Sequence, residues 1–183
     1  MNKYYTGIGT REENLPKGVQ SLMVAMGKGL AKRGYILRSG AASGADTAFE
    51  VGCESGGGEA EIFLPWRGFR NRRNQSKDAK IRFYVPNDGR MEHAGNYWVE
   101  SGIIPHYFKM SPSSRWFHGR NYYQVTGKDG THSDFVLYYA PHDLNDEPMG
   151  GTRSAVMRAR DLGIPTYNLG NEVEILAFES TWR

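Results

Sequence analysis

Hydrophobic residues along the chain fall into short continuous runs and into longer stretches with a helical period. The short apolar runs predict β-strands at residues 4–9, 35–37, 61–64, 134–140 and 164–169. Residues with i, i+4 and i+7 spacing predict helices that start near Asn14, after Gly44, at Ser113, after Gly151 and at Asn171. Because strands and helices alternate, the pattern predicts an α/β fold: a Rossmann-like parallel sheet flanked by helices.

The regular alternation stops at Pro65 and resumes after Ser133. At 183 residues the chain suits a single Rossmann-like domain spanning 1–183, so we expect residues 65–133 to form an aromatic and basic insert on the sheet. Residues 85–89 read as a turn within it. Its basic run either holds a polyanion such as nucleic acid or is a solvated loop, and both readings stay open. The candidate patch consists of Arg67, Arg70, Arg72, Arg73, Lys77 and Lys80.

Overall composition narrows the class of protein only slightly. The net charge of +3 identifies no partner. A single cysteine, Cys53, excludes an intrachain disulfide and a multi-cysteine metal site and fits a reducing compartment. The histidines lack metal-ligand spacing, so we expect neither a metal nor a cofactor. Without a membrane-length apolar run or a signal-peptide pattern, we expect no membrane partner and a cytoplasmic location.

The candidate chemistry centres on the small-residue turn between the strand at 35–37 and the next helix. A turn of this kind places free backbone N–H groups at a helix N-terminus, where they favour an anion. Gly40 and Gly44 permit close backbone approach, and serine hydroxyls add donors. We interpret the turn as a nucleotide-phosphate cradle, although a glycine-rich turn that binds nothing fits the pattern as well. Its candidate residues are Ser39, Gly40, Ala41, Gly44 and Asp46.

Two further glycine turns follow predicted strands. The first strand ends in Gly7, Gly9, Thr10 and Arg11, and Arg11 could reach a phosphate or ribose. The apolar strand at 134–140 is followed by Gly150, Gly151, Thr152 and Arg153 at the start of a helix. Since adjacent parallel strands end at one sheet edge, we expect these turns and the cradle to face one ligand.

Three stretches resemble the SLOG superfamily, especially its DprA/Smf branch and small bacteriophage-type relatives: residues 5–12, 37–46 and 150–165. The resemblance implies a Rossmann-like nucleotide-binding fold and, from the DprA branch, binding of single-stranded DNA. It also implies that Arg120 and Asn121 complete the anion pocket, since they match an arginine-asparagine pair of that branch. Relatives of this type often self-associate, so a homodimer or other homo-oligomer is expected.

The more distant, lysine-decarboxylase-like LOG branch releases a base from a nucleoside monophosphate and uses a glutamate shortly after its glycine turn. In this chain no carboxylate follows Gly151 until Asp161, although Glu12, Asp46 or Glu50 could substitute as the catalytic group. We therefore expect a protein that binds a nucleotide or single-stranded DNA in DNA processing or recombination. The alternatives are a nucleoside-monophosphate phosphoribohydrolase or base transferase, and a sensor or sequestering protein for a nucleotide-derived signal.

Overall fold

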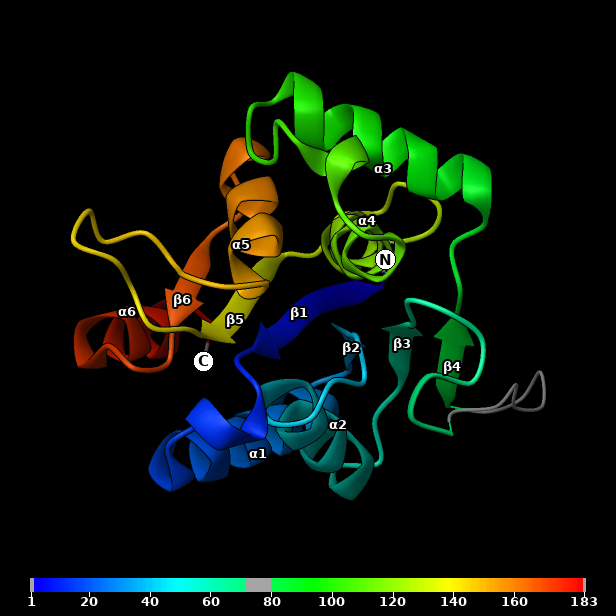
Figure 1. The fold of residues 1–183 in the computed structure, drawn as a ribbon. Coiled ribbons are helices and arrows are strands. Elements are labelled where there is room, and N and C mark those ends of the chain that lie inside the picture. Colours follow the sequence, from blue (N-terminus) through cyan, green and yellow to red (C-terminus); the bar gives the residue numbers. More distant parts are fainter. Residues whose placement is uncertain (1, 72–79, 183) are drawn as a thin grey trace.

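The computed structural model describes residues 2–71 and 80–182. Its strands form one six-stranded parallel sheet in the order β4-β3-β2-β1-β5-β6 (Figure 1). The strands are β1 (Lys3–Gly9), β2 (Tyr35–Ser39), β3 (Ala60–Phe63), β4 (Ile81–Tyr84), β5 (Phe135–Tyr139) and β6 (Thr166–Asn168). The helices are α1 (Lys17–Lys32), α2 (Ala45–Ser55), α3 (Asp88–Glu100), α4 (Pro112–Thr126), α5 (Thr152–Asp161) and α6 (Glu172–Trp182). The predicted α/β, Rossmann-like arrangement is confirmed.

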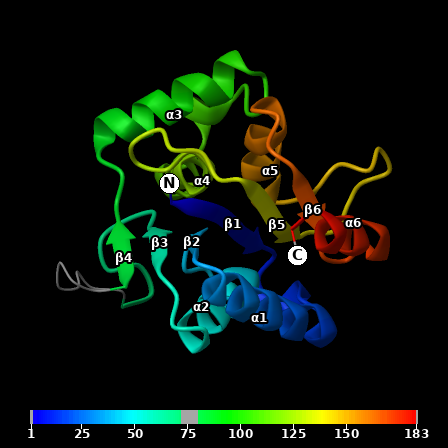
Figure 2. The same cartoon turned by 180° about the vertical axis from the view of Figure 1, so that it is seen from behind.

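Helices cover both faces of the sheet, as the two opposite views show (Figures 1 and 2). On one face, α1, α2 and α6 bury Met23, Phe49 and Phe178 against the strands. On the other face α4 and α5 pack on β1 and β5, and α3 lies outside α4 with Trp98 fully buried. The sheet is therefore buried on both sides, which explains why its central strands are continuous apolar runs.

The direction of strand addition reverses between β1 and β5. The chain builds β1 to β4 outward in one direction, then returns to pair β5 with β1 and adds β6 on the other side. The loops after β1 and β5 consequently diverge at the carboxyl ends of neighbouring strands. In open α/β sheets this switch point leaves a crevice where ligands bind.

The segment 65–133 contributes more regular structure than the sequence pattern indicates. Edge strand β4 and helix α3 were both missed, and residues 85–89 do not form the predicted turn. Instead, the Asn87 side chain accepts from the Arg90 N–H at 3.0 Å and caps α3, so Asp88 and Gly89 are helical. Four half-buried residues at a sheet edge give too short a run for β4 to be recognised from its pattern.

The closing helix α6 buries only part of its apolar surface. Val173 is 74% and Leu176 is 65% exposed, whereas Phe178 is 4% exposed. No helix in the described part of the chain has both the length and the apolar character that a bilayer span requires.

Candidate functional site

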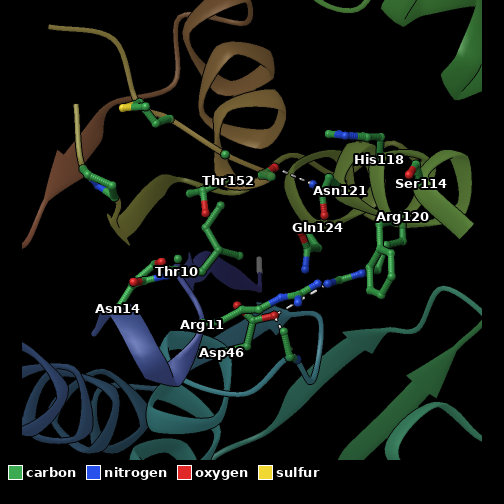
Figure 3. A pocket seen from close by; sticks show the side chains of 18 residues that line it. Thr10, Arg11, Asn14, Asp46, Ser114, His118, Arg120, Asn121, Gln124 and Thr152 are labelled. Atoms are coloured by element: carbon green, nitrogen blue, oxygen red, sulfur yellow. Dashed lines mark hydrogen bonds and ion pairs between the residues drawn. The ribbon is translucent and has the colours of Figure 1, made fainter. Parts of the chain in front are cut away.

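A cavity of about 530 Å³ lies at the switch point, within the size range of small-molecule sites (Figure 3). Four segments form its walls: the loop after β1, the loop between β2 and α2, one face of α4, and the loop between β5 and α5. The lining residues are Ile8, Gly9, Thr10, Arg11, Asn14, Ala42, Asp46, Ser114, Phe117, His118, Arg120, Asn121, Gln124, Pro141, Met149, Gly150, Gly151 and Thr152.

A buried ion pair forms one side of this cavity. The Arg120 guanidinium, from α4, lies 3.7 Å from the Asp46 carboxylate at the start of α2, and both side chains are nearly inaccessible to solvent. Burial raises the pKa of Asp46 above its ordinary value, while Arg120 and the Ala42 N–H, which donates to Oδ2 at 3.2 Å, oppose the increase. The pair thus places a fixed cation and an acceptor together at low dielectric.

Gly40 leaves the space that the guanidinium occupies. A Cβ at this position would lie 1.2 Å from Arg120 Nη1 and 2.2 Å from Gln124 Nε2. With its amide oxygen directed at the Gly40 N–H, Gln124 accepts from that N–H at 3.0 Å and from Arg120 Nη1, and its nitrogen donates to Asn121 Oδ1 at 3.0 Å. Gly40 therefore makes room for the arginine and does not itself line the cavity, whereas Ala42 of the same turn does.

The start of α5 forms the opposite wall and remains open. Its N-cap, Gly151, provides no side-chain cap, and among the described residues neither the Gly151 nor the Thr152 backbone N–H donates a hydrogen bond. A Cβ built at Gly151 meets nothing within 4 Å. Free N–H groups at the positive end of a helix dipole are suited to an anion.

Side chains of α4 hold this turn in place. Asn121 Nδ2 donates to the Gly151 carbonyl at 2.9 Å and to Ser154 Oγ at 3.0 Å. His118 Nδ1 lies 3.0 Å from the same Ser154 hydroxyl. Burial, together with the positive charge of Arg120, lowers the pKa of His118, so this imidazole is neutral at physiological pH.

The two helix N-termini that we expected to act alike are not equivalent. At α2, the carboxylate of Asp46 occupies the position of an anion and accepts from the backbone. The Ala45 N–H is used by the Thr10 carbonyl at 3.1 Å. A carboxylate of the protein itself therefore occupies the α2 end, whereas the first turn of α5 contains no acidic residue.

Nine predicted binding residues line the cavity: Gly9, Thr10, Arg11, Asp46, Arg120, Asn121, Gly150, Gly151 and Thr152. The others lie outside its lining: Gly7, Ser39, Gly40, Ala41, Gly44 and Arg153, together with the catalytic candidates Glu12 and Glu50. Glu12 is exposed in a short 3-10 helix, and Glu50 is buried within α2.

Internal contacts account for several residues that do not reach the cavity. The Ser39 hydroxyl donates to the Gly7 carbonyl at 2.7 Å, so it is not available to a phosphate. A Cβ at Gly7 would lie 2.6 Å from Phe49, and one at Gly44 would lie 2.5 Å from backbone of the Thr10–Glu12 loop. Arg153 donates to the Ile103 carbonyl at 3.3 Å.

The sequence reasoning missed four cavity residues with informative side chains: Asn14, Phe117, His118 and Gln124. Three of them share a helix face with Arg120 and Asn121, because positions three or four residues apart lie together. Extending the recognised pair by helical spacing would have found Phe117, His118 and Gln124. Asn14 is the last residue of a 3-10 helix that has no sequence signature of its own.

The basic run is described only in part, since Arg72, Arg73 and Lys77 lie outside the described residues. Arg70 Nη1 donates to the Ala41 carbonyl and to Thr47 Oγ1, each at 3.2 Å, and thereby fixes the backbone beside the cavity. Lys80 donates to the Gly57 carbonyl at 2.8 Å, and Arg67 is exposed. These three cations do not line the cavity.

No family model and no curated protein matches the sequence. Several solved structures match the fold. DNA processing protein A (DprA) from Helicobacter pylori, described with a single-stranded DNA binding mode, aligns at a TM-score of 0.53 with 13% identity, over 91% of this chain and 65% of that chain. DprA from Streptococcus pneumoniae aligns at 0.55 with 15% identity, over 92% and 50%.

A third match comes from a protein of different function. The molybdenum cofactor carrier protein of Chlamydomonas reinhardtii aligns at a TM-score of 0.54 with 16% identity, over 99% of this chain and 84% of that one. Identities this low establish the fold alone. The chain therefore has a DprA-like, SLOG-type fold, as its motifs indicate.

Proposed function

We propose that this protein binds a nucleotide through a single phosphate group, held at the N-terminus of α5 in the switch-point cavity. One observation carries the proposal: the unused N–H groups of Gly151 and Thr152 face a cavity whose other wall holds the buried pair of Arg120 and Asp46. An anion site opposite a fixed donor-acceptor pair suits a molecule with a charged end and a polar body.

The phosphate end is the better defined part of the proposal. The Gly151 and Thr152 N–H groups, the Thr152 hydroxyl and the exposed Arg11 guanidinium from the loop after β1 all border the same space. Charge-assisted hydrogen bonds from such groups favour a phosphate over a neutral ligand. Because Asp46 already fills the α2 terminus, we expect room for one phosphate and reduced affinity for di- and triphosphates.

The polar body of the ligand would meet the α4 wall. Arg120 supplies donors and Asp46 an acceptor, which can serve ribose hydroxyls or a base edge, while Phe117 supplies an apolar surface. The phosphate could belong to a free nucleotide or to a single-stranded DNA, and the similarity in fold to DprA favours testing the strand. With either source of the phosphate, the proposed function is recognition of a nucleotide in DNA processing.

Titration calorimetry of the full chain with a nucleoside-monophosphate panel tests the proposal. We expect saturable 1:1 binding that Arg11→Ala weakens about tenfold, as for loss of one charged contact of ~1.4 kcal/mol. Lys28→Ala, which removes an exposed cation on α1 outside the cavity, is the matched control and should bind as the parent does.

A 5′-phosphorylated oligonucleotide in a parallel titration separates the two ligand sources. If the strand is the ligand, its affinity exceeds that of every mononucleotide and falls steeply with salt. If neither nucleotides nor strands bind, or if Arg11→Ala and Lys28→Ala have equal effects, the proposed site is wrong.

A further inference from the structure

A second cavity, of about 440 Å³, lies at the other end of α4. The switch-point cavity uses α4 residues from Ser114 to Gln124, whereas this one uses Tyr122 to Thr126 and the loop that leads into β5. Its remaining walls come from the start of α3 and from α5. It therefore opens near the amino end of β5, away from the carboxyl edge where the first cavity lies.

Positive charge dominates the lining of this second cavity. The ionisable groups that line it, apart from two tyrosines, are Arg90 and His93 from α3, Lys128 and His132 from the loop before β5, and Arg158 from α5. No aspartate or glutamate among the described residues lines it. A concave surface with cations from three separate elements concentrates positive potential.

Arg158 is the deepest of these cations. Its side chain is held between the rings of Tyr97 and Tyr122, with its guanidinium carbon 4.1 Å and 4.8 Å from the two centroids. Asp161 accepts from Nη1 at 3.1 Å, but the buried Nε has no hydrogen-bond partner among the described residues. Asp161 and the two rings therefore hold this guanidinium in a fixed position at the wall of the cavity.

The Tyr122 hydroxyl links Arg158 to the imidazole of His93 at the cavity. Tyr122 Oη accepts from Arg158 Nη2 at 3.3 Å and lies 3.3 Å from His93 Nε2. The N-terminus of α3 adds the positive end of its helix dipole to the cavity. The Asn87 side chain caps this end by accepting from the Arg90 N–H alone. Donors from a helix start, a hydroxyl, and Arg and His side chains thus surround one space.

We infer that this cavity is a second anion site, which takes a compact phosphate-class dianion such as a phosphomonoester or pyrophosphate independently of the switch-point cavity. The inference does not depend on the proposed nucleotide site, because no residue lines both cavities. Two sites on one helix would let the protein hold two phosphate groups of one long ligand or two separate ligands.

Calorimetry with inorganic pyrophosphate tests the inference on the full chain. The second site is recognised as a binding event that survives Arg11→Ala. That event should weaken at least tenfold in Arg158→Met and at least threefold in Lys128→Met and in His93→Gln. Lys128 and His93 are exposed, so their variants report on binding even if Arg158→Met does not fold. Lys28→Met is the matched surface control and should leave the event unchanged.

The results that would overturn the inference are distinct from failure of the nucleotide site. If no pyrophosphate binds, or if all binding disappears in Arg11→Ala, the second cavity is not an anion site. The same follows if Lys128→Met and His93→Gln both match the control. Absence of nucleoside-monophosphate binding to the parent chain, with the pyrophosphate event retained, would refute the nucleotide proposal alone.

Discussion

Substituting Gly40 by alanine adds one methyl group at the position most tightly coupled to the candidate site. The backbone at Gly40 has no positive φ that would exclude a side chain, so the effect is steric. The new Cβ would lie 1.2 Å from Arg120 Nη1 and 2.3 Å from its Cζ, so the guanidinium must move. Its displacement separates Arg120 from Asp46 and from Gln124.

The size of the effect follows from the contacts that are lost. Forcing an extra methyl group into a packed interior costs ~1–3 kcal/mol. Breaking a buried ion pair costs ~3–5 kcal/mol, but here the adjacent cavity lets the guanidinium move toward solvent. We therefore expect Gly40→Ala to lower the free energy of unfolding by ~2–4 kcal/mol.

Urea denaturation followed by circular dichroism measures this loss, and a double-mutant cycle assigns its cause. In an Arg120→Met background the clashing nitrogen is absent, so Gly40→Ala should cost at least ~1 kcal/mol less than in the parent. The reasoning is refuted if Gly40→Ala has parental stability, or if its cost is the same in both backgrounds.

Three further predictions use the same denaturation assay. Gly29→Ala, in open space within α1, should raise the free energy of unfolding by ~0.5–1 kcal/mol, and a decrease would contradict its placement. Gly52→Ala should lower it by ~1–3 kcal/mol, because its Cβ would lie 2.4 Å from the Val24 carbonyl; an unchanged value would argue against this close helix contact. Burial lowers the pKa of His118, so the unfolded chain binds its proton more readily and stability falls as the pH drops below about 6.5. His118→Gln should therefore flatten this pH profile, and an unchanged profile would contradict the prediction.

The architecture was predictable to the extent that the hydrophobic pattern is continuous. The stretches 35–37 and 135–139 lie in central strands, are buried almost throughout and contain only apolar and aromatic residues, so their pattern is unambiguous. Strand β4 lies at the edge of the sheet, and polar residues interrupt the hydrophobic pattern of α3. Both elements depend on tertiary packing around Trp98, which a local sequence pattern does not record.

The sequence predicted where the candidate site lies better than it predicted the role of each residue in it. Glycine turns after the correct strands identified the cavity, but Gly7 is required by the Phe49 side chain, Gly44 by neighbouring backbone and Gly40 by a side chain from α4. The pattern of glycines does not distinguish a close approach to a ligand from a close approach to another segment. That distinction requires the partner atoms.

The central claim is that a nucleotide phosphate binds the free N–H groups at the start of α5. The most direct measurement is the amide ¹H–¹⁵N spectrum of the full chain, titrated with a nucleoside monophosphate. We predict saturable shifts that are largest for Gly151 and Thr152 and that need about tenfold more nucleotide to saturate in Arg11→Ala. Shifts that leave these two amides unmoved, while others saturate elsewhere, would contradict the account.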